Sequence, residues 1–268
     1  MDAESRTEMS RGTRQKRASG IPILTFHDVD DRPAVISFPP DVFRAGFVAL
    51  QEKGYRTLDL LEATSLLRSG ERIPEKSLVL TFDDGFRGVY ENAFPMLRRL
   101  GMTATVFLSV GGQCPSGFAG RLSSLEGRSM LSWEEIREMH SAGITFGAHT
   151  LTHPDLTGMA FDKVEEELLG SKRIIEDALG VEVTTFAYPF GRYDTRVREL
   201  VGNHFNCACS DRLGVASGKS DPLALERIEA YYFRTEFLFS LLSSRLFPWY
   251  LLMRAIPRGS RRRVMRIL

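Results

Sequence analysis

The adjacent carboxylates Asp83 and Asp84 follow an apolar run, L-V-L-T-F (78–82), and precede Gly85. Asp-Gly is common in turns, so the pair could belong to a surface turn. Alternatively, each carboxylate has a different task in a working site. The choice depends on which other reactive side chains the fold brings to this point of the chain.

The motif H-T-L-T-H contains His149 and His153, two of only five histidines in the chain. A lone histidine is more often structural than a ligand, but this spacing puts both imidazoles on one side of a helical turn, close enough to share a metal. Two imidazoles and one carboxylate make a catalytic zinc-type ligand set with positions left open for water. The carboxylate must come from elsewhere, and the pair Asp83 and Asp84 is the obvious donor.

These residues lie among apolar runs that alternate with helical patterns from Ile21 onward. Strands that alternate with helices favour parallel β/α units, and seven or eight such units favour an α/β fold, a distorted parallel (β/α) barrel. The predicted strands are residues 23–27, 55–58, 77–82, 104–110, 144–149, 184–188, 206–210 and 225–230, and helices are predicted at 43–53, 89–100, 132–143 and 161–179.

Reactive side chains recur where the predicted strands end. His27 and Asp28 follow the first strand, Asp83 and Asp84 the third, and His149 the fifth. In a parallel β/α barrel the active site lies at the carboxyl ends of the strands, where the loops converge. We therefore expect these distant segments to face one pocket.

The two ends of the chain differ from its middle. Residues 1–20 are polar and basic and are predicted to form a disordered tail, residues 21–232 a catalytic domain, and residues 233–268 an apolar and basic helical extension at the C-terminus. The stretch 111–130 is rich in Gly and Ser and is predicted to be a loop that serves as a lid.

Residues 237–256 form an apolar segment of 20 residues, close to the length of a membrane span. Arg245, Pro248 and Arg254 interrupt it, and a charge at the centre of a span costs about 2.5–3.5 kcal/mol on insertion scales. The segment is therefore expected not to cross a bilayer. Two alternatives remain: a helix pair at a membrane interface with Trp249 among the headgroups, giving peripheral membrane association, or helices packed against the domain.

The composition sets further limits. A net charge of +1 gives no reason to expect a nucleic-acid partner. Cys114, Cys207 and Cys209 are too few for a disulfide framework, and the one-residue gap between the last two is not a usual zinc spacing. No apolar core precedes Ile21, so no secretory signal is expected, and the predicted location is cytoplasmic or peripheral on the inner membrane face.

The motifs T-F-D-D-G (81–85) and H-T-L-T-H (149–153) together resemble those of the polysaccharide deacetylase family, the group four carbohydrate esterases with a NodB-homology domain. The stretch S-W-E-E-I-R-E-M-H-S-A-G-I-T-F-G-A-H-T (132–150) is similar to the family's lead into its histidine motif. The run F-A-Y-P-F-G-R-Y-D (186–194) resembles the third motif of the biofilm-polysaccharide deacetylase branch. The resemblance spans residues 21–230.

The resemblance implies that Asp84, His149 and His153 bind a divalent metal, zinc in the first instance, and that Asp83 is the general base. The chemistry agrees with this division. A metal lowers the pKa of bound water and polarises an acetamide carbonyl, while a second, unligated carboxylate takes the proton of the water. Adjacent residues at a strand end point in different directions, so the doublet supplies one ligand and one base.

Two departures from the family pattern concern the partners of this site. The third motif usually begins with an Arg that braces the base, but here Tyr188 precedes Pro189. Arg227, in L-E-R-I-E of the last predicted strand, is predicted to supply the missing cation; the alternative is an ordinary surface arginine. Tyr188, Pro189, Phe190 and Arg227 are expected on the substrate side, with a backbone N–H near Phe190 aimed at the oxyanion, unless Pro and Gly serve only a tight turn.

The second departure is the absence of the family's late Leu-x-His motif, whose histidine protonates the leaving amine; no histidine follows His204. His27 is predicted to be the acid, which resembles an N-terminal motif of the biofilm branch; the alternative is a purely structural role. The first and last strands of a closed barrel are neighbours, so the substitution is sterically sensible. Asp28 is expected to orient this imidazole or to contact substrate.

The sequence therefore predicts a metal-dependent hydrolase that removes acetyl groups from N-acetylated amino sugars in a polysaccharide or glycolipid. The alternatives are hydrolysis of another non-peptide C–N or ester bond by the same centre, and a glycan-binding pseudoenzyme. The expected partner is an N-acetylated glycan or a lipid-linked sugar. A lipid-linked sugar would reconcile this chemistry with the lack of a predicted secretory signal.

Overall fold

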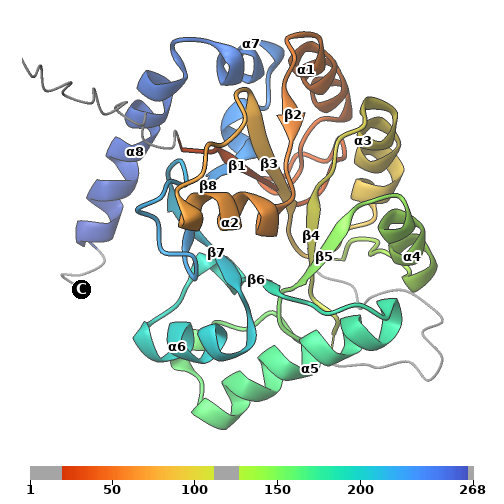
Figure 1. Cartoon of the computed structure of the whole chain (residues 1–268), viewed down its shortest axis with the longest axis vertical. Coiled ribbons are helices and arrows are strands. Elements are labelled where there is room, and N and C mark those ends of the chain that lie inside the picture. Colours follow the sequence, from red (N-terminus) through yellow and green to blue (C-terminus); the bar gives the residue numbers. More distant parts are fainter. Residues whose placement is uncertain (1–19, 112–126, 265–268) are drawn as a thin grey trace, which may run out of the picture.

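A computed structural model describes residues 20–111 and 127–264 of the 268-residue chain, with side chains as far as Ala255. Of the tail predicted for residues 1–20, all but Gly20 lie outside the described residues, and of the lid predicted for residues 111–130, residues 112–126 lie outside them. Within the described part, the chain forms a barrel of parallel strands surrounded by helices (Figure 1).

Seven strands close the barrel, as the sequence predicts. The order around it is β1-β8-β7-β6-β5-β4-β3, and β1 also pairs with β3, which completes the ring. The short β2 pairs with β3 alone and lies outside the closed ring. The strands are β1 (Ile23–Phe26), β2 (Arg56–Thr57), β3 (Ser77–Phe82), β4 (Thr105–Leu108), β5 (Thr145–Ala148), β6 (Thr185–Ala187), β7 (Cys207–Leu213) and β8 (Leu225–Glu229).

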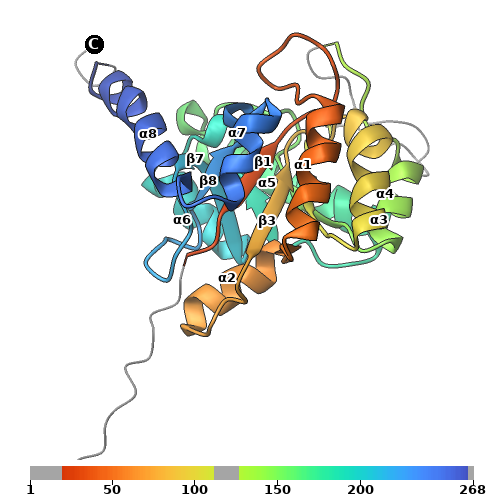
Figure 2. The same cartoon turned by 90° about the horizontal axis from the view of Figure 1, so that it is seen from above.

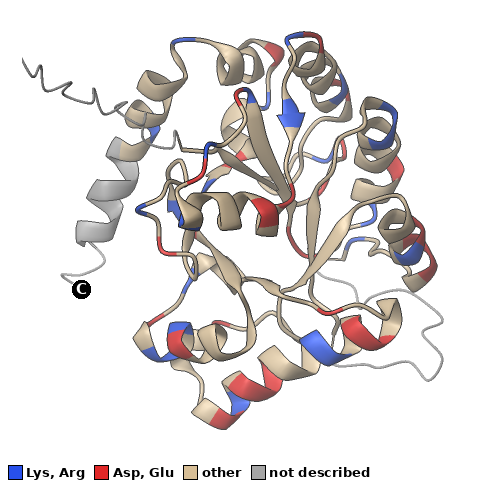
Figure 3. Cartoon of the chain, in the orientation of Figure 1, with Lys and Arg blue, Asp and Glu red and all other residues tan. Residues whose placement is uncertain are grey.

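The helices lie around the outside of the ring, where they and the loops carry most of the charged residues (Figure 3). Ser132 and Glu135 form the predicted capping box at the start of α4 (Trp133–Ser141). The helix predicted over 89–100 is divided, because Pro95 has no N–H for the helical ladder and a π-helical turn, Val89–Ala93, precedes α3 (Phe94–Leu100). The other helices around the ring are α1 (Pro40–Glu52), α2 (Leu60–Ser69), α5 (Phe161–Leu179) and α6 (Thr195–His204).

Alternate residues of each strand belong to two separate cores. One set of residues fills the interior of the barrel. The residues that alternate with them along each strand pack outward against the helices, as the two-residue period of a strand requires. The inner set includes Ile23, Val79, Phe107, Ala187, Cys207, Cys209 and Leu225, and the outer set includes Leu24, Leu80, Val106, Ala148, Ala208 and Ile228. Cys207 and Cys209 therefore share one face and serve packing.

A glycine lets one aromatic ring fill the inside of the barrel. Phe107 and Gly147 are register partners on β4 and β5. A Cβ on Gly147 would lie 2.6 Å from the Phe107 ring, so only glycine admits the ring at this position. Phe107 is completely buried, and the guanidinium of Arg227 lies over its ring, 6.0 Å from the centroid. The inner packing therefore reaches up to the polar end of the barrel.

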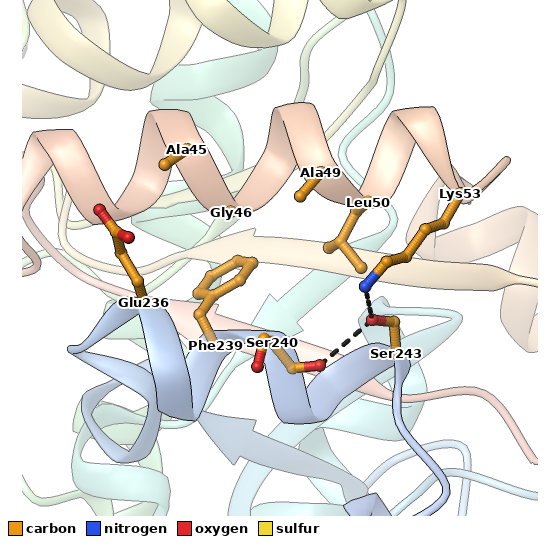
Figure 4. A pocket seen from close by; sticks show the side chains of 9 residues that line it. All are labelled: Ala45, Gly46, Ala49, Leu50, Lys53, Glu236, Phe239, Ser240 and Ser243. Carbon is orange, nitrogen blue, oxygen red and sulfur yellow. Dashed lines mark hydrogen bonds between the residues drawn. The ribbon is translucent and has the colours of Figure 1, made fainter.

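The C-terminal extension packs against the barrel through its inner face. It comprises α7 (Glu236–Ser240), a 3₁₀ turn (Leu241–Ser243) and α8 (Phe247–Val264). The Phe239 ring points towards α1 at Gly46 (Figure 4) and lies 5.3 Å from the ring of Phe47. Lys53 Nζ donates to Ser243 Oγ at 2.8 Å. No helix among the described residues combines the length and apolar character that a bilayer span needs.

Replacing Gly46 by alanine tests this packing. A Cβ at Gly46 would lie 2.3 Å from Cδ1 of Phe239, whose ring is 2% exposed. We expect Gly46→Ala to lower the free energy of unfolding by about 1–3 kcal/mol, the usual effect of overpacking. Chemical denaturation measures the change.

Gly202→Ala, in α6, is the matched control. Its Cβ would meet only the terminal methyl of Leu223, at 2.7 Å, and that side chain can rotate. Alanine is more stable than glycine inside a helix by about 0.5–1 kcal/mol, and this gain should offset the cost of the contact with Leu223. If Gly46→Ala is as stable as Gly202→Ala, Phe239 is not tightly held against α1.

Candidate active site

The chain turns sharply after β3, and this turn separates the two adjacent carboxylates. Asp83 continues the strand and its N–H donates to Phe26 O at 2.9 Å. Asp84 and Gly85 then adopt left-handed backbone conformations, with φ of 74° and 85°. Such a conformation is strained for a residue other than glycine. As a result Asp83 points to β8 and Asp84 points to the histidines.

Asp84, His149 and His153 converge on one point. Asp84 Oδ1 lies 3.4 Å from Nε2 of each histidine, and the two Nε2 atoms are 3.2 Å apart. One ligand atom from each residue falls within 4.8 Å of the others. The structure thus brings together the three residues for which the resemblance implies metal binding.

The donor set fits a divalent cation. Asp84 Oδ1 is buried without a hydrogen-bond partner among the described residues. His149 Nδ1 donates to Ala187 O at 2.7 Å, which leaves the Nε2 lone pair of the neutral ring facing Asp84. Burial lowers the pKa of His149, but the Asp84 and Asp83 carboxylates raise it by more. Burial and the neighbouring His149 lower the pKa of His153 to about 4, so this ring is a neutral ligand at ordinary pH.

The histidine loop is clamped by a carboxylate that the sequence analysis missed. Glu167 of α5 is 8% exposed, and its Oε2 accepts from the N–H groups of Leu151 and Thr152 at 2.8 and 2.9 Å. Its Oε1 accepts from Thr152 Oγ1 at 2.6 Å. These bonds hold a loop in which Thr150 and His153 have positive φ, 71° and 58°. The signal in the sequence is a glutamate on the otherwise buried face of a helix.

Asp83 forms a two-point ion pair with Arg227, as the hypothesis of a replacement cation requires. Nη1 and Nη2 of Arg227 donate to the two Asp83 oxygens at 2.8 and 2.7 Å. Arg227 Nε donates to Ser210 O at 3.1 Å, and Nη1 also reaches Thr81 Oγ1 at 3.3 Å. Both partners are buried, so Arg227 is not a surface arginine.

The Arg227 guanidinium keeps Asp83 ionised. Burial raises the pKa of the Asp83 carboxyl, but the charge and hydrogen bonds of Arg227 lower it by more, so the pKa lies well below its usual range. The carboxylate is therefore available as a proton acceptor over the whole ordinary pH range.

A cavity of about 330 Å³ collects these groups at the carboxyl ends of the strands. His27, after β1, lines it together with both aspartates and both histidines. Two further carboxylates that the sequence analysis did not single out, Asp211 and Glu229, also line it. Strand periodicity could have found them, because Asp211 lies two residues beyond Cys209 and Glu229 two residues beyond Arg227.

The third motif is only partly at the cavity. Tyr188 and Phe190 line it, whereas Pro189 is buried and does not. The Tyr188 ring is wholly buried, and its hydroxyl donates to Leu223 O at 2.8 Å. Phe190 has a positive φ of 57°, is 57% exposed and packs edge-to-face on His153 at 4.7 Å. Phe190 is thus the residue of this motif best placed to touch a substrate.

Asp28 lies elsewhere. Its Oδ2 accepts from Arg128 Nη1 at 2.8 Å, and both residues are buried. It lines a separate cavity of about 510 Å³ with Asp30, Arg87 and Gly88, and it does not line the cavity that contains His27. Consecutive side chains at a strand end point to opposite sides, so His27 and Asp28 are separated.

Comparisons with known proteins agree with this geometry. The family model of polysaccharide deacetylase matches residues 70–204, half of the chain. The Bacillus subtilis (strain 168) protein named "Putative polysaccharide deacetylase YxkH" is 28% identical over 224 residues, which cover 82% of this chain and 75% of that protein. The poly-beta-1,6-N-acetyl-D-glucosamine N-deacetylase of Escherichia coli (strain K12) is 30% identical over 142 residues. These cover 49% of this chain but only 21% of that protein.

Solved structures share the fold. The Streptococcus pyogenes deacetylase PplD in complex with acetate superimposes with a TM-score of 0.70 at 27% identity, over 79% of this chain and 92% of that chain. A polysaccharide deacetylase from Bacillus cereus gives a TM-score of 0.69 at 26% identity, over 83% of this chain and 68% of that chain. IcaB from Ammonifex degensii gives 0.73 at 24% identity, over 88% and 98% of the two chains.

Arg227→Met would leave the buried Asp83 carboxylate without its counter-charge. We expect the free energy of unfolding to fall by about 3–5 kcal/mol at neutral pH, as for other broken buried pairs. The double variant Asp83→Asn/Arg227→Met removes the stranded charge and should recover much of the loss. Denaturant titration of the two variants and the parent protein measures both effects.

This loss should depend on pH. Because the folded pKa of Asp83 is depressed, the stability that the ion pair contributes is fully present above the unfolded pKa of about 3.9 and is lost as the pH falls below it. In Arg227→Met, burial should instead raise the pKa of Asp83. Its carboxyl then takes up a proton on acidification and the deficit shrinks. Equal deficits at neutral pH and near the unfolded pKa would contradict the ion-pair account.

Glu167→Met should weaken metal binding without removing a ligand. The N–H groups of Leu151 and Thr152 would lose their acceptor, so the loop that carries His149 and His153 would no longer be held. We expect zinc affinity to fall about 10- to 100-fold, the usual effect of losing a residue that orients ligands. Competition with a chromophoric chelator measures it.

Glu166→Met is the control, since Glu166 is on the same helix but exposed and pairs only with Lys163 among the described residues. It should bind zinc as the parent does. A folded Glu167→Met variant with the zinc affinity of the control would show that the clamp does not position the histidines.

Proposed function

The chain belongs to the polysaccharide deacetylase family, and we propose that it is a metal-dependent hydrolase that removes acetyl groups from N-acetylated amino sugars in a polysaccharide or glycolipid. The observation that carries this proposal is the division of labour between two adjacent carboxylates. Asp84 faces His149 and His153, whereas Asp83 faces Arg227 and stays ionised at the same cavity.

Asp84, His149 and His153 would hold the metal. A divalent metal bound there supplies a Lewis acid for the acyl carbonyl and a lowered pKa for the attacking water. Two imidazoles and a single carboxylate are a donor set suited to zinc. The remaining steps fall to the side chains around this centre.

Asp83 acts as the general base. It takes a proton from the water that attacks the acetamide carbon, and Arg227 holds its carboxylate in place by two hydrogen bonds. The ion pair makes Asp83 a weaker base than a free carboxylate, but it guarantees that the acceptor is never already protonated. The lone pairs that Arg227 does not use remain for the water.

His27 acts as the general acid. It lines the same cavity as Asp83 and follows β1, the strand that pairs with both β3 and β8. Its imidazolium gives a proton to the amide nitrogen as the C–N bond breaks, so acetate and a free amine leave. Asp211 and Glu229 add negative charge to the cavity wall, which suits an amine that leaves as an ammonium ion.

The choice of an N-acetylated amino sugar rests on the relatives. The Escherichia coli relative is named for deacetylation of poly-beta-1,6-N-acetyl-D-glucosamine, and the Streptococcus pyogenes deacetylase was solved with acetate. A lipid-linked sugar is the second member of the proposed substrate class.

Acetate release from a panel of compounds tests the function. The panel contains N-acetylglucosamine oligomers of different linkage, a lipid-linked N-acetyl sugar and an O-acetylated glycan. We expect acetate from an N-acetylated member, loss of release with a chelator and recovery with zinc. Asp83→Asn should retain zinc and lose about 10²–10⁴-fold in rate, the usual contribution of a general base.

Asp84→Asn is the matched variant, since it alters the neighbouring carboxylate. It should lose zinc and activity together, unlike Asp83→Asn. If acetate is released from the O-acetylated glycan alone, the protein is an esterase and the proposed amidase activity is refuted. Full turnover by Asp83→Asn would refute the base assignment, and zinc binding without turnover on any member would favour a glycan-binding role.

A further inference from the structure

The C-terminal extension exposes large apolar side chains on one face. Leu246 is 60% exposed, Trp249 68%, Leu252 58% and Met253 62%. Their spacing of three and four residues places them on one side of α8 and the residue before it; we call this set the apolar stripe. Tyr250 and Leu251, on the other side, are buried against the domain. Phe237, 74% exposed, adds a further apolar side chain in α7.

The inner face of α8 has its own partners, so the apolar stripe is not needed for folding. The Tyr250 hydroxyl donates to Tyr232 O, and its ring lies 5.3 Å from that of Phe233. Arg254 donates to the Tyr250 hydroxyl at 3.0 and 3.1 Å. The helix is thus held in one orientation, with the apolar stripe turned outward.

The segment that carries the apolar stripe has charges of a single sign. From Phe237 to the end of the chain there is no Asp or Glu, whereas Arg245, Arg254, Arg258, Arg261, Arg262, Arg263 and Arg266 lie in this segment. The Arg245 side chain is exposed beside the stripe. An apolar face within a basic segment is the pattern of a helix that lies in the interface of an anionic membrane.

We propose that α8 binds the surface of an anionic lipid bilayer, with the apolar stripe in the headgroup region and the arginines on the lipid phosphates. A second copy of the chain is a poorer occupant, because it would bring an equally basic segment against this one. Anionic lipid supplies both the apolar phase and the opposite charge. The proposal does not depend on the proposed function.

Helix α8 extends towards the end of the barrel that holds the cavity. In Figure 2 the C-terminal end of α8 and the loop that follows β1 lie towards the top, whereas α2 lies at the bottom. His27 and Asp83 directly follow β1 and β3, so the cavity that they line lies at the carboxyl ends of these strands, where the loop after β1 begins. The C-terminal end of α8 therefore lies towards the same end of the barrel as the cavity.

Vesicle binding by the full chain tests the proposal. The chain has two tryptophans, of which Trp133 is 1% exposed and Trp249 68%. We expect co-sedimentation with vesicles of phosphatidylglycerol and phosphatidylcholine, and a shift of tryptophan emission to shorter wavelength as Trp249 leaves water. Phosphatidylcholine alone should bind at least tenfold more weakly. Raising the salt to about 1 M, where the screening length is about 3 Å, should weaken binding to the anionic vesicles.

Three variants identify the surface. Trp249→Glu/Leu252→Glu/Met253→Glu should lower the partition coefficient at least tenfold while thermal unfolding stays unchanged, since these side chains are exposed. Phe161→Glu, at a 51% exposed position on α5, is the control and should bind as the parent does. Trp249→Phe should keep binding but lose the emission shift.

Absence of binding to anionic vesicles would overturn the proposal. Equal loss in Phe161→Glu and the triple variant would also overturn it, because the effect would then be one of net charge. Light scattering measures the oligomeric state. If the parent is a dimer that does not bind vesicles and the triple variant is a monomer, the apolar stripe serves self-association instead.

Discussion

The ion pair between Asp83 and Arg227 is the interaction around which the site is built. It joins β3 to β8, the two strands that flank β1 at the point where the ring closes. Removing two charges from water costs several kcal/mol per ion, and the two-point geometry together with the bonds to Ser210 O and Thr81 Oγ1 offsets that cost. With Asp83 committed to Arg227, only its neighbour Asp84 is left to face the histidines.

The two-residue period of the strands carries the inner packing directly into the chemistry. Every second residue of a strand faces the interior, so the position beyond the last inner residue opens into the cavity. The inner core and the site are therefore successive layers of one arrangement. The series that show it are Ile23, Thr25 and His27; Val79, Thr81 and Asp83; Cys207, Cys209 and Asp211; and Leu225, Arg227 and Glu229.

Much of this was predictable from the sequence, because apolar runs and reactive pairs are local signals. All eight strands lie where they were predicted, and the closed ring follows from them. Helices α2 and α6 were missed although their caps are present in the sequence: Asp59 and Gly70 at the two ends of α2, and Asp194 at the start of α6. The place of Glu167 on a buried helix face marks it as unusual, but its partners could not be predicted, since they are backbone groups whose positions depend on left-handed residues in a separate loop. The position of Asp28 depends on Arg128, a contact across 100 residues that local patterns do not contain.

The described part of the chain has five residues other than glycine with a left-handed backbone, and four of them, Asp84, Thr150, His153 and Phe190, surround the site. Each such conformation costs about 1–3 kcal/mol, so the barrel gives up stability where its ligands are displayed. Glycine or asparagine would relieve the strain at these positions but would remove the metal-binding groups of Asp84 and His153, the ring of Phe190 and the Thr150 hydroxyl that accepts from the N–H of His153. Selection for thermal stability alone would thus erode these four positions first, and their retention in a functional lineage would have to be maintained by the chemistry itself.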